Sequence, residues 1–266
     1  MITTDFLPGS PCWLDLGSPE VAASAAFYRS VFGWEFRSSG PNATGYGAFR
    51  LEGATVAALG PLTEPGARSA WMVYFQVPDA RASAETVERL GGSVRVAPAE
   101  MAGWGKMGQF TDPLGAEFAV WEPGGSSLGL EMVDQPGTLS WIELYTTDGE
   151  AARRFYRELF GWQIVDIPLP GGGPGSYALI GPAEAGPERM QGGMMELPAD
   201  SLARSEGRPY WHPVFAVADC DEVITRIVRG GGSVQIGPHE TEGVGRLAVC
   251  LDPYAADFVV LAPGTP

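Results

Sequence analysis

Large apolar residues near the start of the chain change from an alternating spacing to a helical one. Residues 13–16 (WLDL) alternate bulky and mixed side chains, which predicts a strand. Ser18 and Pro19 then suit the cap and first turn of a helix. The following apolar positions fall on one helical face: Val21, Ala25, Tyr28 and Phe32. Gly33 is a natural C-terminal stop, so a strand and an amphipathic helix are predicted.

The same pattern occurs a second time without a gap. Residues 13–34 read WLDLGSPEVAASAAFYRSVFGW and residues 141–162 read WIELYTTDGEAARRFYRELFGW, at a constant offset of 128. In the second copy, residues 147–150 fit a capping box and Gly161 is expected to end the helix. A long repeat of this kind indicates two copies of one domain.

Short strands separated by Gly, Pro and Asn follow each helix. We expect them at residues 34–37, 46–51 and 55–59, and again at 162–167, 176–180 and 192–197. A second strand, helix and three strands are predicted at 71–77, 79–90, 94–97, 106–111 and 117–121. The second half mirrors this part at an offset of 140, which places 12 additional residues in it. We expect them in the Gly/Pro-rich stretches 168–175 and 181–189.

These repeats predict an α+β fold of four βαβββ modules in two pairs. We expect an N-terminal leader at residues 1–10, which looks loose, a first domain at 11–121, a linker at 122–138 and a second domain at 139–266. Because each half holds two modules, each domain can form within one chain. The protein is therefore expected to be a monomer or a homodimer.

Composition narrows the possible partners. The 266 residues include 32 acidic and 17 basic side chains, for a formal net charge of −15. An acidic surface repels nucleic acid and anionic membranes, so we expect neither as a partner. Three cysteines without CxxC spacing indicate neither a disulfide framework nor a zinc motif. No signal peptide is visible at the start, which predicts a cytoplasmic protein.

Two repeated motifs carry a resemblance to a known family. They are FYR-x-x-FGW, in both predicted helices, and Asp-Pro-x-x-Ala, at residues 112–116 and 252–256. The chain resembles the vicinal oxygen chelate superfamily over residues 11–263, and especially its tandem glyoxalase-like proteins. That superfamily includes glyoxalase I, bleomycin-resistance proteins and extradiol dioxygenases. The resemblance implies that each pair of modules curls its sheet into a cup, flanked by helices, that holds a small molecule.

Family members take metal ligands from the first and last strands of each module. The resemblance places the ligand positions at Trp13, Met72, Ala119, Trp141, His212 and Val259. Only His212 is a metal-type residue there, and a catalytic site normally needs three protein ligands. We therefore expect no metal ligands and no cofactor, with His212 as a hydrogen-bonded pocket or core residue. The alternative is a metal site formed by His212, His239 in a loop, and Glu240 or Glu242.

Acidic residues share strand faces with those positions, because side chains two apart point to the same side. On the first strands they are Asp15 and Glu143, and on the last strands Glu117 and Asp257. We expect Asp15 to face Glu117 and Glu143 to face Asp257, where close carboxyl groups support acid–base chemistry. The alternative is that these acids lie in water or bind backbone N–H groups and arginine.

Five tryptophans fall at or near the same faces: Trp13, Trp71, Trp104, Trp141 and Trp211. Apolar walls with a few polar groups are typical of a ligand pocket. Aromatic walls suit a flat, apolar or cationic molecule. Alternatively, the rings fill the core. The Gly-rich stretch 171–175 is a candidate lid over the second cup.

We predict a small-molecule-binding glyoxalase-like protein with a degenerate metal site. It would bind, or transform without a metal, a hydrophobic or aromatic metabolite or antibiotic in resistance or secondary metabolism. His212, Glu143 and Asp257 are the predicted catalytic residues. Those predicted to bind the ligand are Trp13, Asp15, Trp71, Trp104, Glu117, Trp141 and Trp211. The alternative function is a metal-dependent lyase, isomerase or dioxygenase that uses His212.

Overall fold

The computed structural model describes residues 1–40, 45–101, 103–125, 129–170, 172, 175–183 and 185–264. Its first half contains β1 (Pro11–Ser18), α1 (Val21–Phe32), β2 (Glu35–Ser38), β3 (Gly47–Leu51), β4 (Ala54–Pro61), β5 (Ala70–Gln76), α2 (Ala80–Arg89), β6 (Ser93–Glu100), β7 (Gly105–Thr111) and β8 (Glu117–Pro123). Its second half contains β9 (Leu139–Thr146), α3 (Gly149–Phe160), β10 (Gln163–Pro168), β11 (Ser176–Gly181), η1 (Pro187–Arg189), β12 (Gly192–Glu196), η2 (Ala199–Ser205), β13 (Tyr210–Ala216), α4 (Cys220–Arg229), β14 (Ser233–Thr241), β15 (Gly245–Leu251) and β16 (Asp257–Pro263). Within the described part of the chain, no helix combines the length and apolar character that a bilayer crossing requires.

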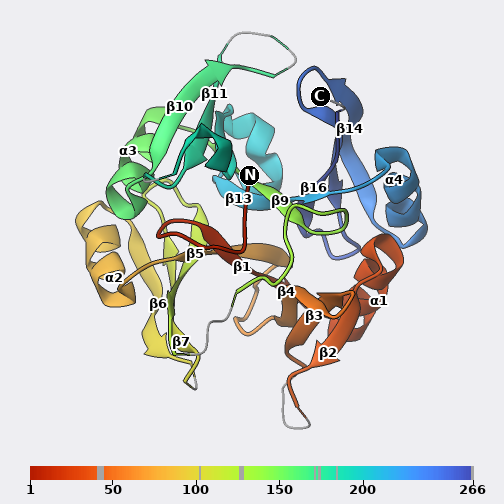
Figure 1. The fold of residues 1–266 in the computed structure, drawn as a ribbon, viewed down its shortest axis with the longest axis horizontal. Helices are drawn as coiled ribbons and strands as arrows, with labels where there is room; N and C mark the ends of the chain where they lie inside the picture. The colour runs from red at the N-terminus through yellow and green to blue at the C-terminus, as the bar shows by residue number, and fades with distance from the viewer. Residues whose placement is uncertain are drawn as a thin grey trace. The chain divides into compact units, whose positions relative to one another are not determined.

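Each half contributes one eight-stranded mixed sheet (Figure 1). The strand order is β2-β3-β4-β1-β5-β8-β7-β6 in the first sheet and β10-β11-β12-β9-β13-β16-β15-β14 in the second. Sequential neighbours such as β7 and β8 are antiparallel, whereas β1 with β4 and β5 with β8 are parallel pairs. The two sheets repeat one plan, so the predicted α+β fold of four βαβββ modules is confirmed.

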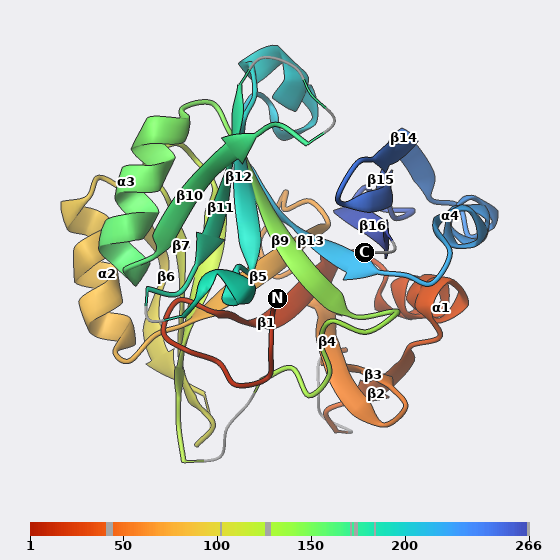
Figure 2. The ribbon, with the colours of Figure 1, turned by 45° about the horizontal axis from the view of Figure 1, so that its top comes forward.

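The chain packs into two compact units that do not coincide with its halves. The first compact unit contains residues 1–13, 73–129 and 141–211, and the second contains residues 14–72, 130–140 and 212–266. Each compact unit therefore combines one module of each half. Figures 1 and 2 both show α2 beside α3, in the first compact unit, and α1 beside α4, in the second. The domain limits proposed from the repeat stay a prediction.

The FYR-x-x-FGW motif supplies the aromatic core of each compact unit. In the second, Tyr28 stacks on Trp34 with ring centroids 5.5 Å apart, and Phe32 lies 5.2 Å from Phe215. In the first, Tyr156 stacks on Trp162 at 5.4 Å. Large buried rings contribute strongly to the stability of a core, which explains why the motif occurs in both halves.

Each motif tyrosine also lies in a buried hydrogen-bond network. In the first compact unit, the Trp211 indole N–H donates to the Tyr156 hydroxyl at 2.9 Å, and this hydroxyl donates to Asp112 Oδ2 at 3.0 Å. The other oxygen of Asp112 accepts three backbone N–H groups from the turn that follows it. The second compact unit repeats the tryptophan, tyrosine and aspartate with Trp71, Tyr28 and Asp252. The two motifs are therefore parts of one structural network.

The predicted start of α1 at residues 18–19 is wrong. The helix begins at Val21, and its cap residue Glu20 makes no capping hydrogen bond with its side chain. Ser18 is the buried last residue of β1, where its hydroxyl accepts the Glu20 N–H at 3.1 Å and lies 2.7 Å from the Ser24 hydroxyl. The serine therefore ties the strand to the helix rather than capping it.

Glycine ends α1 and α3 as predicted. Gly33 and Gly161 have φ values of 79° and 68°, in the left-handed region that glycine adopts without strain. At the other end of α3, the carboxylate of Asp148 accepts the Ala151 N–H at 2.9 Å. Asp148 is therefore the cap residue within the predicted capping box.

Residues 1–10 form a packed segment and not the loose leader predicted. The Gly9 carbonyl accepts a hydrogen bond from the Trp162 indole N–H at 2.8 Å in the first compact unit. In the second, the Gly137 carbonyl accepts one from Trp34, also at 2.8 Å. Gly137 lies 128 residues after Gly9, so the repeat extends upstream of β1.

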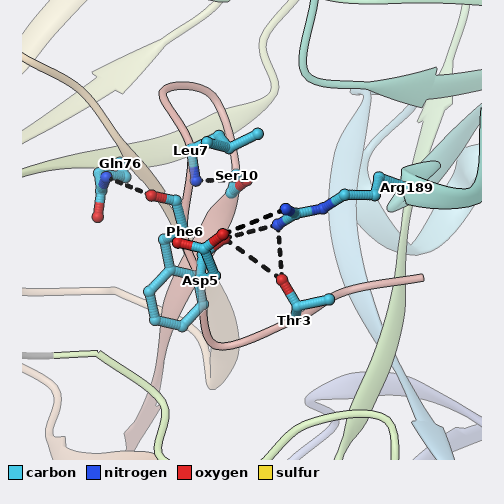
Figure 3. A network of polar contacts seen from close by, with 7 residues as sticks. All are labelled: Thr3, Asp5, Phe6, Leu7, Ser10, Gln76 and Arg189. Atoms are coloured by element: carbon cyan, nitrogen blue, oxygen red, sulfur yellow. Dashed lines mark hydrogen bonds and ion pairs between the residues drawn. The ribbon is translucent and has the colours of Figure 1, made fainter. Parts of the chain in front are cut away.

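The N-terminal segment also contacts the connection between β11 and β12. Figure 3 shows Arg189, in η1, donating to the Thr3 hydroxyl and the Asp5 carbonyl at 2.6 Å each. Gln76 of β5 donates to the Phe6 carbonyl at 2.8 Å in the same view. These bonds join the segment to η1 and to β5 of the first compact unit.

The additional residues of the second half lie in three places. The β11–β12 connection is longer than the β3–β4 connection, as predicted for residues 181–189. The β12–β13 connection, which contains η2, is also longer than its counterpart between β4 and β5. The predicted stretch 168–175 belongs to the β10–β11 hairpin, which is also longer than its counterpart: Gln163 pairs with Gly181, 18 residues later, whereas Glu35 pairs with Arg50, 15 residues later.

Candidate functional site

The strand faces that point away from the helices carry the predicted acids, and we call them the open faces. In β8, the Phe118 ring contacts Phe155 and Tyr156 of α3, so the neighbouring Glu117 lies on the open face. In β16, the Phe258 ring contacts Tyr28 and Phe32 of α1. Asp257 therefore lies on the open face as well.

The first strands show the same alternation. Leu14, Ile142 and Leu144 are fully buried, whereas Asp15 and Glu143 are partly exposed. Trp13 and Trp141 share the faces of these two acids and are also partly exposed. The spacing of two that the sequence suggested is therefore present in the described strands.

His212 and Asp257 form a contact between two neighbouring strands of the second compact unit. β13 and β16 are parallel, and the pairing of Val214 with Val259 places these two residues side by side. The His212 Nδ1 lies 2.5 Å from Asp257 Oδ1, and the side chains are 1% and 18% exposed. The carboxylate orients the imidazole through Nδ1, the arrangement that fixes a histidine for hydrogen bonding or proton transfer.

Glu143 belongs to a second polar group, in the first compact unit. The Trp141 indole N–H donates to the Tyr177 hydroxyl at 2.9 Å, and this hydroxyl donates to Glu143 Oε1 at 2.6 Å. Burial raises the pKa of Tyr177 well above 10, and the nearby charge of Glu143 raises it further. Tyr177 therefore keeps its proton and holds it against the carboxylate.

Two glycines allow this arrangement. A Cβ on Gly193 would lie 2.1 Å from the Tyr177 Cζ and hydroxyl oxygen, so the phenol ring lies directly against the β12 backbone. Glu143 pairs with Gly193 across the β9–β12 ladder, and the ring crosses β12 to reach it. In the second compact unit, Tyr46 lies against Gly60 and donates to Asp15 Oδ1 at 2.8 Å.

Sequence reasoning missed both tyrosines. Tyr46 lies directly before β3, and Tyr177 lies in β11, at corresponding places of the two halves. The available signal was weak: each tyrosine is in a short predicted strand that follows a glycine. The contact with the first-strand acid depends on strand pairing, which a sequence does not state.

The structure describes the predicted acid pairs only in part. Glu117 is exposed and forms an ion pair with Arg95 at 2.5 Å, which matches the alternative of acids bound to arginine. Asp15 and Glu117 belong to different compact units, as do Glu143 and Asp257. The two pairings therefore stay predictions.

The five predicted tryptophans have different environments. Trp71 and Trp211 are 5% and 4% exposed, and both donate their indole N–H to a core tyrosine. For these two, the structure favours the core-packing interpretation. Trp104 is 46% exposed, and Trp13 and Trp141 are partly exposed on the open faces.

The residues at the expected ligand positions do not fit a metal. Among the described residues, no three His, Cys, Asp or Glu side chains gather closely enough to hold an ion. His239, predicted in a loop, is an exposed residue of β14 and pairs with Leu247. Tryptophan, methionine, alanine and valine at the other positions do not supply the hard oxygen and nitrogen donors that such ions need. The candidate lid at 171–175 lies mostly outside the described residues.

Comparisons with known proteins agree with this architecture. The family described as "Glyoxalase-like domain" matches residues 13–121, and "Glyoxalase/Bleomycin resistance protein/Dioxygenase superfamily" matches residues 138–258. The chain is 39% identical to the anthracycline biosynthesis protein DnrV of Streptomyces peucetius, over 97% of this chain and 94% of that protein. It is equally similar, with the same coverage, to the anthracycline biosynthesis protein DauV of a Streptomyces species.

Among solved structures, the Mn(II)-bound glyoxalase from Novosphingobium aromaticivorans shares the fold. Its TM-score is 0.63 at 19% identity, over 96% of this chain and 83% of that chain. The chain thus belongs to the glyoxalase/bleomycin resistance protein/dioxygenase superfamily, also called the vicinal oxygen chelate superfamily, with two glyoxalase-like domains in tandem.

Proposed function

We propose that this protein binds a planar aromatic small molecule of secondary metabolism, of the anthracycline class, on its open faces. The observation that carries the proposal is the His212–Asp257 contact at 2.5 Å, on the strand where the family places a metal ligand. The pair of His212 and Asp257, whose carboxylate is 18% exposed, takes the place of a metal-bound group as the polar anchor for the ligand. The similarity to two anthracycline biosynthesis proteins over almost the whole chain supports the ligand class.

In the first compact unit, partly exposed aromatic side chains offer a stacking surface to the same class of ligand. Trp141 is partly exposed beside the polar group of Glu143, and Trp13 is partly exposed on β1. Flat ring systems stack on such indoles. A few fixed polar groups among apolar walls determine orientation and specificity.

A second candidate function is acid–base catalysis on the same ligand without a metal. The His212–Asp257 contact favours it, because an imidazole that is oriented by a carboxylate can accept and return a proton. Incubating the protein with an anthracycline, followed by mass spectrometry of the ligand, distinguishes turnover from binding alone.

The test of the proposal is a fluorescence titration with an anthracycline. Replacing His212 by Phe is expected to weaken binding by about 1–3 kcal/mol, the cost of losing one oriented hydrogen bond. Met72 is the matched control, because it holds the corresponding place in β5 and its replacement by Leu is nearly volume-conserving. Equal affinities of the His212→Phe protein and the parent would contradict the proposal. So would zinc, nickel, manganese or iron that stays bound at one equivalent through dialysis.

A further inference from the structure

Two hydrogen bonds lead in one direction towards Glu143. The Trp141 N–H donates to Tyr177, and the Tyr177 O–H donates to the carboxylate. Both donors are committed towards Glu143, so the chain of bonds ends in an acceptor. A ligand group that reaches this carboxylate must therefore donate a hydrogen bond, and a cationic donor makes the strongest bond of this kind.

Aromatic residues flank this acceptor along β9 of the first compact unit. Tyr145 lies two residues after Glu143 on β9, and its ring is 5.6 Å from that of Tyr210, nearly perpendicular to it. Tyr145 is also close enough to Tyr177 to contribute to raising its pKa. A carboxylate beside indole and phenol side chains is an environment that attracts an ammonium group. The net charge of −15 adds a long-range attraction for cations and opposes anions.

The backbone maintains this environment. Gly193 lets the Tyr177 ring lie against β12, where any larger residue would displace it. Tyr177 is 6% exposed, so packing holds its side chain and its hydroxyl in one position. The acceptor is therefore set before a ligand arrives, which reduces the entropy lost on binding.

We propose that the group formed by Glu143, Tyr177 and Trp141 is a specificity site for the protonated amine of an aromatic ligand. This inference rests on the proposed function and names a chemical feature of the ligand that the function alone does not require. Neutral or anionic aromatic molecules of the same size would lack the charge-assisted bond to Glu143. The site would then select amine-bearing ligands among similar ring systems.

The experiment compares two probes: an anthracycline with a free amino group and the same compound after N-acetylation. Acetylation removes the positive charge and leaves the ring system unchanged. We expect the parent protein to bind the free amine about tenfold more tightly or better, the size of one charge-assisted hydrogen bond. Glu143→Gln should reduce this ratio to near one. Tyr177→Phe keeps the ring on Gly193 and should reduce the ratio by a smaller factor.

Glu158→Gln is the matched control, since it removes the same charge from the exposed surface of α3. It should keep the ratio of the parent. Equal binding of both probes by the parent would overturn the inference, while the proposed function would stand. Failure of both probes to bind would overturn the proposed function and the inference with it. A preference for the amine that Glu143→Gln retains would show that another residue holds the cation.

Discussion

Asp112 shows that a repeated motif identifies an important residue but not its hydrogen-bond partner. The sequence marks it, because the Asp-Pro turn recurs at Asp252. The structure shows that Asp112 is 4% exposed and accepts a hydrogen bond from the hydroxyl of Tyr156, 44 residues away. That partner belongs to the other half of the chain, and no local spacing relates the two residues.

The buried state of Asp112 predicts a pH dependence of stability. Burial raises the pKa of Asp112 more than its hydrogen bonds lower it, so the folded protein holds this proton more tightly than the unfolded chain. The free energy of unfolding should fall as pH rises from about 4, the ordinary carboxyl range, through the raised value. Asp112→Asn removes the titration and can keep the backbone bonds to Oδ1. Urea denaturation across this range should give a shallower decline for the variant, and an equally steep one would contradict the assignment.

The candidate site was predictable to the extent that it depends on strand alternation. Glu143 and Asp257 follow from a spacing of two along single strands, and His212 from the family resemblance. The contact between His212 and Asp257 required the pairing of β13 with β16. Tyr177 was not predictable, because its ring reaches Glu143 across an intervening strand.

At the scale of elements, the backbone of β12 provides the surface against which side chains of the neighbouring strands pack. Its residues Gly192 and Gly193 lie in the middle of a sheet, where glycine ordinarily weakens a strand. Here a Cβ on Gly192 would lie 2.5 Å from the Ile142 side chain, and one on Gly193 would meet Tyr177. The close approach of side chains from both neighbouring strands explains the pair of glycines.

Replacing Gly193 by Ala tests this explanation. The added methyl group must displace the Tyr177 ring, which breaks its bond to Glu143 and overpacks the sheet. We expect a loss of about 1–3 kcal/mol in the free energy of unfolding. Gly125→Ala is the control, because an added Cβ there meets no atom within 4 Å. Denaturation curves that are equal for the two variants would show that Tyr177 does not depend on Gly193.

Element ends were predictable where one residue determines them and not where neighbours compete. Gly33 and Gly161 end their helices because a left-handed residue can follow the last turn. The predicted start of α1 is wrong, because Ser18 is the last residue of β1 and its hydroxyl contacts the Ser24 hydroxyl. The packing of the N-terminal segment is not predictable from local sequence, because its main bonds are made by Trp162 and Arg189, far along the chain.

At the scale of the whole molecule, the repeat predicted the number of modules and not their partners. Two identical strand orders follow from two similar sequences. The compact units, however, each combine one module of the first half with one of the second. A repeat shows that the modules are alike. It therefore does not show whether a module packs with one from its own half or with one from the other half.

Aromatic contacts within the compact units join the two halves of the sequence. In the second compact unit, the Trp34 ring from the first half lies 5.3 Å from Phe215 of the second half. In the first compact unit, Phe75 from the first half lies 4.8 Å from Phe160 of the second. Separation of the halves would expose these rings to water at a large cost in hydrophobic free energy.

We therefore expect that neither half folds as a monomer by itself. Residues 1–121 and 130–266, expressed separately, should lack the near-ultraviolet circular dichroism of packed aromatic rings, or should self-associate through the exposed surfaces. Mixing the two fragments should restore that signal and a cooperative unfolding transition, because each fragment supplies the rings that the other lacks. Analytical ultracentrifugation of each fragment and of the mixture provides the measurement. A monomeric fragment with a cooperative transition of its own would show that the contacts within one half are sufficient for folding.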